Sequence, residues 1–257
     1  MIVAIDIGNT NITFGFFRKE KAELLHSGNI KTDISMTTEE LAIAYKNLKE
    51  LWKIEDEVVK AVLICSVVPQ LNYEFLHMFE KYFKITPRVI ENSEIPLKIE
   101  YDFPAEIGTD RLINAFGGIN TFPEKNLMIV DFGTATTIDV VRKDKTYLGG
   151  IILPGIITSL RELEMRAAKL PHIHLTPPKN VVGKNTIECI RSGIFNGHGG
   201  MIDELTERIA KEMGWNDYYV IATGGLSKVI KDFSLSINHV DPHLTLSGIY
   251  YLWKKNI

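Results

Sequence analysis

The sequence lacks any long apolar run. None of its 257 residues lies in an uninterrupted hydrophobic stretch of the roughly 18 that a membrane-spanning helix needs. It also begins without a basic segment followed by an apolar one, so we expect no secretory signal, no membrane partner and a cytoplasmic location. Its two cysteines, Cys65 and Cys189, form no CxxC motif, and we expect both to remain reduced thiols in the core. No cluster of five or six Lys or Arg residues occurs, and the net charge is −3, so nucleic-acid binding has no electrostatic basis and a small molecule is the expected partner.

Common phosphate-binding and nucleophile motifs are missing as well. No GxxxxGK[ST] loop occurs. Gly183 and Lys184 match the Gly-Lys of this motif, but its first glycine would fall at Pro178. The GxGxxG pattern and the GxSxG elbow are absent too. His172 and His174 have no third His or Cys at ligand spacing, which favours surface histidines over a zinc site. What is present is a globular composition, 45% hydrophobic and 24% charged, long enough for one large domain or two modest ones.

The first 15 residues predict a β-hairpin with polar groups at its tip. An apolar run starting at Ile2 breaks at Asp6, turns through Gly8 and Asn9, and becomes apolar again up to Gly15. The turn can aim amides, hydroxyls and backbone N–H groups at an anion, and a carboxylate beside phosphates has the natural task of holding Mg²⁺. The alternative is an ordinary Asn/Gly hairpin in which Asp6 hydrogen-bonds the turn.

The same pattern occurs a second time. Leu127–Val141 again combines an apolar strand, an Asp, a Gly, a run of hydroxyls and a second apolar strand. Asp131 and Gly133 follow Asp6 and Gly8 by the same 125 residues, which is close to half of the chain. A duplication is the economical explanation.

Strand and helix patterns alternate along both parts of the chain. A third strand is expected at Ala22–Thr32, the capping-box pattern Thr37–Glu40 opens a helix, and a long helical region runs from about Asn185 to Met213. This alternation predicts mixed sheets covered by helices. We therefore expect an α/β fold with two halves, residues 1–115 and 116–257, that flank a cleft in which a ligand meets both hairpin tips.

Asp110 is the best candidate for a catalytic base. Phosphoryl transfer requires a group that orients the acceptor hydroxyl and takes its proton, and this group is usually an Asp. Asp110 lies between a Pro-containing loop and an apolar helical run, which predicts a helix N-terminus, with Arg111 beside it to pair with an anionic substrate. The alternative is that Asp110 is only an N-cap or first-turn acid. Ala222–Ser227, a strand running into glycines, would let a flat base or a sugar approach the backbone, unless it is merely a strand-to-helix turn.

Together these residues resemble type III pantothenate kinase, a family in the acetate and sugar kinase/Hsp70/actin superfamily. Its fold is a duplicated ribonuclease-H-like, or actin-like ATPase, fold. The matching segments follow one another along nearly the whole chain: Asp6–Thr10, Tyr101–Pro104, Gly108–Arg111, Asp131–Asp139, Gly149–Gly155, Gly183–Thr186, Ser192–Gly193, Ala222–Gly225 and Leu244–Gly248. Several motifs in the same order are far more specific than any one of them.

The resemblance implies ATP-dependent phosphorylation of pantothenate to 4′-phosphopantothenate, the first step of coenzyme A biosynthesis. It implies an ATP-binding set that consists of Asp6, Ile7, Gly8, Asn9, Thr10, Asn11, Ile12, Thr13 and Thr134. It implies a pantothenate-binding set that consists of Tyr101, Gly108, Thr109, Asp110, Arg111 and Thr186, with Asp110 as general base. Mg²⁺ accompanies ATP in the family, and Asp131 is implied to bind a monovalent cation, K⁺ or NH₄⁺.

The family resemblance also implies a homodimer whose substrate site lies near the interface, across which Thr186 would act. Thr109 stands where the family often has Ala. Two alternative functions are known among related proteins and are considered for this chain. A non-catalytic transcriptional regulator of the Bvg-accessory type would be favoured by loss of Asp110 or by a basic surface. A kinase of another small hydroxyl substrate is the second, although the zinc motif of repressor-related sugar kinases cannot be formed by two distant cysteines.

Overall fold

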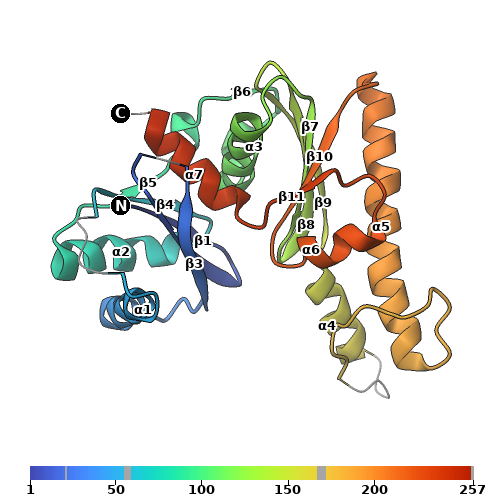
Figure 1. Ribbon diagram of the computed structural model, residues 1–257, viewed down its shortest axis with the longest axis horizontal. Coiled ribbons are helices and arrows are strands. Elements are labelled where there is room, and N and C mark those ends of the chain that lie inside the picture. Colours follow the sequence, from blue (N-terminus) through green and yellow to red (C-terminus); the bar gives the residue numbers. More distant parts are fainter. Residues whose placement is uncertain (21, 55–58, 167–171, 256–257) are drawn as a thin grey trace. The chain divides into compact units, whose positions relative to one another are not determined.

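The computed structural model describes residues 1–20, 22–54, 59–166 and 172–255, which form two compact units (Figure 1). The first unit comprises Met1–Lys98, Asp102–Thr121 and Leu244–Ile257, and the second comprises Ile99–Tyr101 and Phe122–His243. Each unit contains one mixed sheet, which confirms the expected α/β class. The division of the sequence at residues 115 and 116, drawn from the repeated motif, stays a prediction.

The sheet of the first unit has the strand order β3-β2-β1-β4-β5. Its strands are β1 (Ile2–Ile7), β2 (Asn11–Phe17), β3 (Leu24–Lys31), β4 (Ala61–Ser66) and β5 (Arg88–Val89). The first three are antiparallel neighbours, whereas β4 runs parallel to β1 and β5 parallel to β4. A parallel strand needs a crossover connection, and the helical segments that follow β3 and β4 provide it.

Helices cover both faces of this sheet. Val3, Ile5 and Ile7 of β1 point to one face and join a core with residues of α1 (Thr38–Leu51) and α2 (Pro69–Met78), which continues into a π-helical turn, η1 (Phe79–Phe83). The opposite face carries α7 (Leu244–Lys255), where the rings of Phe17 and Tyr250 stack with centroids 4.8 Å apart.

The C-terminal helix α7 packs against α3 (Thr109–Thr121) at a pair of glycines. A Cβ on Gly117 would lie 2.9 Å from the carbonyl oxygen of Leu244 and 3.3 Å from the Cα of Gly248. Only glycine allows the two helix backbones to approach this closely. Thr245 adds a hydrogen bond from its hydroxyl to Asn114 Oδ1, at 2.8 Å. The C-terminal helix α7 is thereby part of the first unit.

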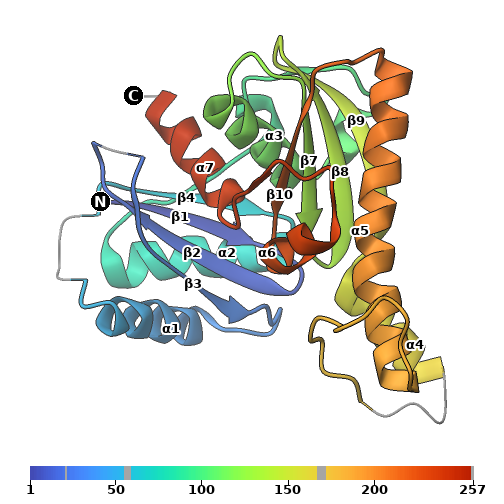
Figure 2. The ribbon, with the colours of Figure 1, turned by 45° about the vertical axis from the view of Figure 1, so that its right-hand side comes forward.

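The sheet of the second unit has the order β11-β10-β7-β8-β9-β6. Its strands are β6 (Lys98–Ile99), β7 (Leu127–Phe132), β8 (Ala135–Arg142), β9 (Thr146–Pro154), β10 (Tyr219–Thr223) and β11 (His239–Val240). Met128, Val130 and Phe132 of β7 join a core with residues of the helices that cover one face. These helices are α4 (Ile156–Arg166), α5 (Thr186–Met213) and the short α6 (Ser227–Ile230), and α5 is the long helix that runs along the sheet in Figure 2.

Five strands of the second sheet repeat the pattern of the first. In both, the leading strand is antiparallel to the next, and that strand is antiparallel to the third. The leading strand is also parallel to a fourth strand (β1 with β4, β7 with β10), which is parallel to a fifth (β5, β11). This is the topology that a duplication produces, as the repeated motif predicted.

The helix boundaries agree with the capping signals in the sequence. Thr37 caps α1 in a full capping box with Glu40, and Asn185 caps α5 by accepting the Glu188 N–H at 2.9 Å. Gly214 ends α5 with a φ of +65°, which lies in the left-handed region that favours glycine. Among the residues that the structure describes, no helix combines the length and the apolar character needed to cross a membrane.

Candidate active site

The β1–β2 hairpin presents a polar loop that is fixed from two sides. Four residues separate the paired Ile7 and Ile12, and the Gly8 N–H donates to the carbonyl oxygen of Asn11 at 3.0 Å. Thr32, just past β3, donates its hydroxyl to the Gly8 carbonyl at 2.6 Å and its N–H to the Thr10 carbonyl at 2.9 Å. The side chains of Asn9, Thr10 and Asn11 are exposed at the tip. The loop therefore combines a held backbone with exposed amide and hydroxyl groups.

Asp6, near the end of β1, lies in register with Thr13 on one side and with Cys65 of β4 on the other. Burial raises the pKa of the Cys65 thiol, and the charges of Asp6 and Asp110 raise it further. Cys65 is fully buried, so it stays a neutral thiol. The charges of two carboxylates, one near the end of β1 and one in the first turn of α3, therefore both act on Cys65. The prediction that both cysteines lie in the core is confirmed for Cys65 but is wrong for Cys189, which is exposed in the first turn of α5.

Asp110 lies in the first turn of α3, which begins at Thr109, and the predicted helix N-terminus is thereby confirmed. The Arg111 N–H donates to Asp110 Oδ1 at 2.8 Å. Burial raises the pKa of the Asp110 carboxyl above its ordinary value, and the N–H and the charge of Arg111 oppose the rise only in part. A raised pKa makes a carboxylate a stronger proton acceptor, which suits a general base. Gly108 leaves room for this side chain, because a Cβ there would lie 2.5 Å from Asp110 Oδ1.

Asn92 is a residue of this region that carries no sequence signal. Its Nδ2 donates to the carbonyl oxygen of Ile107 at 2.8 Å, and its Oδ1 accepts the hydroxyl of Thr109 at 2.8 Å. Thr109, noted in the sequence as a departure from the usual Ala, thus has a specific hydrogen-bond partner. Asn92 belongs to no motif and lies 15 to 17 residues from its partners, so only the folded chain reveals it.

The second unit repeats the hairpin in shortened form. Three residues separate the paired Phe132 and Thr136, one fewer than in the first hairpin, and the Gly133 N–H donates to the Ala135 carbonyl at 3.1 Å. Thr134 is exposed, and its carbonyl accepts the Gly155 N–H at 3.2 Å and the hydroxyl of Thr158 at 2.8 Å. The backbone of this tip is therefore also held from outside the hairpin.

Asp131 of β7 lies against the glycine turn after β10. Gly224 has a φ of +87°, and a Cβ there would lie 2.5 Å from Asp131 Oδ1 and 2.8 Å from the carbonyl oxygen of Phe132. Both the left-handed conformation and this close approach require glycine. The Ala222–Gly225 segment, interpreted from the sequence as an approach point for a base or sugar, thus borders the carboxylate of Asp131.

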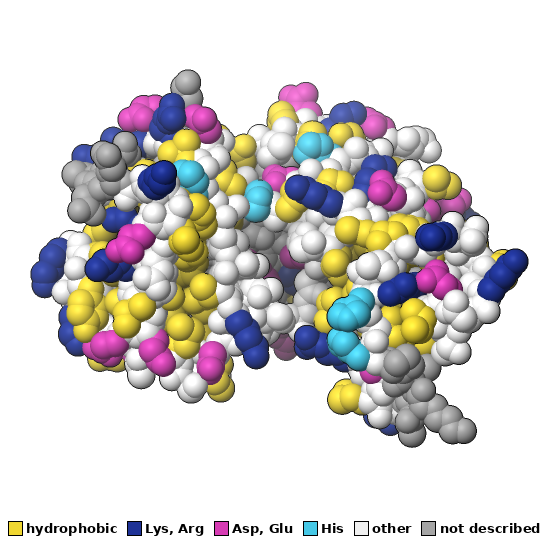
Figure 3. Space-filling model, turned by 60° about the horizontal axis from the view of Figure 1, so that its bottom comes forward, with side chains coloured by type: hydrophobic (Ala, Val, Ile, Leu, Met, Phe, Trp, Pro, Cys, Tyr) yellow, Lys and Arg dark blue, Asp and Glu magenta, His cyan; other side chains and the backbone are white. Residues whose placement is uncertain are grey.

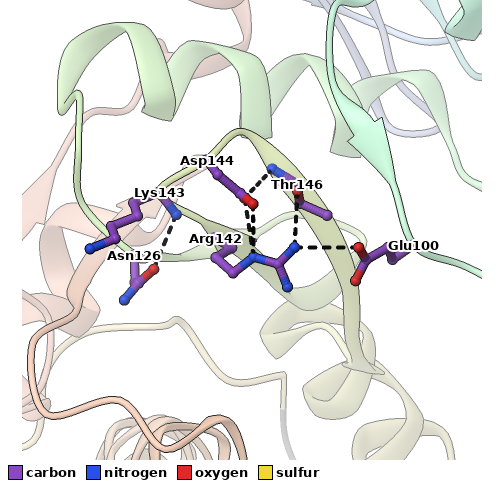
Figure 4. Close-up of polar contacts among 6 residues, drawn as sticks. All are labelled: Glu100, Asn126, Arg142, Lys143, Asp144 and Thr146. Atoms are coloured by element: carbon purple, nitrogen blue, oxygen red, sulfur yellow. Dashed lines mark hydrogen bonds and ion pairs between the residues drawn. The ribbon is translucent and has the colours of Figure 1, made fainter.

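Tyr101 rests on the β8–β9 hairpin. Gly149 has a φ of +104°, and a Cβ on it would lie 3.3 Å from the ring of Tyr101, which packs near Tyr147 with centroids 6.4 Å apart. The Glu100 N–H donates to the Tyr147 carbonyl at 2.9 Å. The side chain of Glu100 pairs with Arg142 at 3.3 Å, and Figure 4 draws this ion pair.

Arg142 is in turn bound by Asp144 at 3.1 Å, and the same close-up includes Thr146, which donates its N–H to Asp144. The segment that carries Tyr101 is therefore tied to the turn between β8 and β9.

A model of the type III pantothenate kinase family matches residues 2–208, most of the chain and both hairpins. The chain belongs to the type III pantothenate kinase family. It is accordingly a phosphotransferase that uses ATP to phosphorylate pantothenate in coenzyme A biosynthesis.

Solved structures similar to this pantothenate kinase span almost its whole length. A conserved putative Baf family transcriptional activator from Campylobacter jejuni is 18% identical, with a TM-score of 0.60 over 99% of this chain and 98% of that one. The activator of 2-hydroxyisocaproyl-CoA dehydratase from Clostridium difficile, with bound ADPNP, is 14% identical, with a TM-score of 0.57 over 99% and 94%. Component A of the (R)-2-hydroxyglutaryl-CoA dehydratase of Acidaminococcus fermentans is 13% identical, with a TM-score of 0.56 over 99% and 98%. At these identities the similarity shows the fold, that of the actin-like ATPases.

The structure brings together part of the site predicted for this pantothenate kinase. In the first unit, Asp6 lies in register with Cys65, and the charges of Asp6 and Asp110 both act on its thiol. In the second unit, Asp131 joins the glycine turn at Gly224. Thr186 is exposed at the first residue of α5, and its part in substrate binding stays a prediction.

Proposed function

We propose that Asp110 is the general base of the pantothenate kinase reaction. Asp110 accepts the proton of the pantothenate hydroxyl while the hydroxyl oxygen attacks the γ-phosphorus of ATP. The bond from that phosphorus to the oxygen shared with the β-phosphate breaks, and ADP leaves. The observation that supports this role is the partly buried carboxylate at the start of α3, whose pKa is raised by burial. Backbone N–H groups at a helix N-terminus lower the pKa of a capping acid, whereas burial outweighs them at Asp110.

ATP phosphates are bound, in this proposal, by Asp6–Thr13 and by Thr134. The exposed groups of the β1–β2 loop act as hydrogen-bond donors on a backbone already held by Thr32. Because the backbone of this loop is held before the reaction, its donors stabilise charge on the phosphates with little reorganisation of the loop. Pantothenate is held by Tyr101, Thr186 and the segment Gly108–Arg111, with Arg111 pairing its carboxylate.

Two cations belong to the proposal. The residues present fit hard cations, because the atoms at each candidate site are oxygens: the Asp6 carboxylate in the first unit, and Asp131 with the Phe132 carbonyl in the second. Among the described residues there is no group of three or more His, Cys, Asp or Glu side chains arranged for a metal ion. Asp6 would hold the Mg²⁺ of ATP, directly or through water, and Asp131 would hold K⁺ or NH₄⁺. When bound, these ions neutralise phosphate charge.

Replacing Asp131 tests the monovalent site. Asp131→Ala should abolish activation by K⁺, measured as the ratio of ADP release rates in K⁺ and in Na⁺ at equal ionic strength. If the variant still responds to K⁺ like the wild type, Asp131 does not hold the monovalent cation. A homodimer with Thr186 acting across its interface, and a cytoplasmic location, also remain part of this proposal.

The central experiment is a coupled assay of ADP release from ATP-Mg²⁺ and pantothenate in K⁺ buffer. Asp110→Asn should lower kcat at least about a hundredfold, since general bases contribute about 10²- to 10⁴-fold. The matched control is Asp217→Asn, which removes a carboxylate from the exposed pair with Lys125 and should leave kcat unchanged. If Asp110→Asn keeps the kcat of the wild type, Asp110 is not the general base and serves only as a helix-capping acid.

The same assay separates the rival functions. Release of ADP with a sugar but not with pantothenate would favour a kinase of another hydroxyl substrate. Release with neither would favour a non-catalytic regulator. Asp110 is retained here, and on the face drawn in Figure 3 the Lys and Arg side chains are interspersed with Asp and Glu rather than gathered into a basic patch. Both features favour the kinase.

A further inference from the structure

Asn92 hydrogen-bonds the residues on both sides of Gly108, through the backbone of Ile107 and the side chain of Thr109. Its amide nitrogen donates to the carbonyl oxygen of Ile107, and its amide oxygen accepts the Thr109 hydroxyl, both at 2.8 Å. A carbonyl oxygen can only accept, so the nitrogen must face Ile107 and the oxygen is left for the hydroxyl. One side chain thus forms hydrogen bonds to the residues immediately before and after Gly108.

The platform that carries Asn92 is itself fixed. Asn92 begins the short 3₁₀ turn η2 (Asn92–Glu94), which follows β5. Glu94 accepts the Glu91 N–H at 2.9 Å and pairs with Arg88 of β5 at 3.1 Å. Ile90 donates its N–H to the Ile64 carbonyl of β4 at 2.8 Å, which extends the sheet pairing up to the turn. The side chain of Asn92 is therefore held in a fixed position relative to β4 and β5.

The segment gripped by Asn92 determines where the carboxylate of Asp110 lies. The Gly108 carbonyl accepts the Arg111 N–H at 3.1 Å and so starts the helix, while Asp110 Oδ1 fills the space that a Cβ on Gly108 would take. Movement of Gly108 therefore shifts the base and its hydrogen-bond donor together. A displacement of about 1 Å in a reacting group can cost about a hundredfold in rate.

We propose that Asn92 is a positioning residue for the catalytic base: by holding Ile107 and Thr109, it sets the place of Asp110 relative to the substrate hydroxyl. This inference rests on the proposed role of Asp110. Asn92 acts through its hydrogen bonds to the Ile107 carbonyl and the Thr109 hydroxyl and takes no part in the proton transfer.

The test is a double-mutant cycle in the ADP-release assay. Asn92→Ala should lower kcat by about ten- to a hundredfold while the KM for ATP stays unchanged. In the Asp110→Asn background the same change should have little further effect, because a residue that acts through Asp110 cannot act when the base is missing. Ser93→Ala, at the exposed neighbouring position of η2, is the control and should keep the kcat of the wild type.

Thr109 variants provide a second, milder route should Asn92→Ala not fold, which its thermal melting would reveal. Thr109→Ala removes one of the two hydrogen bonds and should lower kcat several-fold, and Thr109→Ser, which keeps the hydroxyl, should lose less. An Asn92→Ala effect that multiplies fully with Asp110→Asn, or a kcat equal to that of the wild type, would overturn the inference. An active Asp110→Asn enzyme would instead overturn the proposed general base, so the two failures are distinguishable.

Discussion

Gly108→Ala should separate catalysis from stability. A Cβ at this position would lie 2.5 Å from Asp110 Oδ1, whereas real Cβ atoms essentially never approach within 3.0 Å and ordinary contacts begin at 3.4 Å. The carboxylate must therefore move by about 0.5 to 0.9 Å, a range taken from those contact limits. Since misplacement by about 1 Å costs about a hundredfold, we expect kcat to fall by about ten- to a hundredfold, or about 1.4 to 2.7 kcal/mol of transition-state stabilisation.

The fold should tolerate the same substitution. The atom in the way is the end of a side chain that can rotate, and the φ of Gly108 lies outside the left-handed region. Exchange of Gly for Ala at a compatible position stabilises a protein by about 0.4 to 1 kcal/mol, because the unfolded chain loses conformational freedom.

We therefore expect an unchanged or slightly higher melting temperature together with a lower kcat at saturating pantothenate and ATP. Gly200→Ala is the control, because a Cβ at that exposed helical position meets nothing within 4 Å. Gly108→Ala with the kcat of the wild type would refute the reasoning, since the carboxylate would then not be needed where the structure has it.

The remaining predictions concern ionisation. Because burial raises the pKa of Asp110, the stability contributed by its protonated form is lost as the pH rises through that raised value, so Asp110→Asn should melt at the same or a higher temperature than the wild type at neutral pH. The difference should vanish below about pH 3.9, the ordinary Asp pKa, and an Asp110→Asn protein that is less stable at neutral pH would contradict this. The kcat of the wild type should fall on the acid side with an apparent pKa above that ordinary value. In thiol labelling of the native protein, Cys189, which is exposed, should react, while Cys65, buried and with a raised pKa, should react only on unfolding; equal native labelling rates would contradict the burial of Cys65.

Much of the fold followed from local patterns. The apolar runs at the start of the chain and at Leu127–Val141 predicted the leading hairpins, and their common spacing predicted the repeated topology of the two sheets. The capping box at Thr37 located the start of α1, and the helical pattern from about Asn185 located that of α5. These features are readable because hydrophobic periodicity and capping depend on residues only a few positions apart.

The packing partners of these elements could not be read in the same way. An apolar face predicts that another segment packs against it, but the pattern does not identify that segment. The helix that covers β1 and β2 on one side comes from the end of the chain, where Tyr250 stacks on Phe17. The glycine pair Gly117 and Gly248, 131 residues apart in the sequence, lets α3 and α7 approach each other.

For the site, the sequence by itself determined the chemistry of the two hairpin tips, the glycine-bounded Asp110 at a helix start and, through the order of its motifs, the family. Only the tertiary structure decided that Asp6, Cys65 and Asp110 share one environment, and that Asn92 grips the loop before α3. The reason is physical: a pKa raised by burial and a hydrogen bond between residues 17 positions apart exist only after distant segments have packed together.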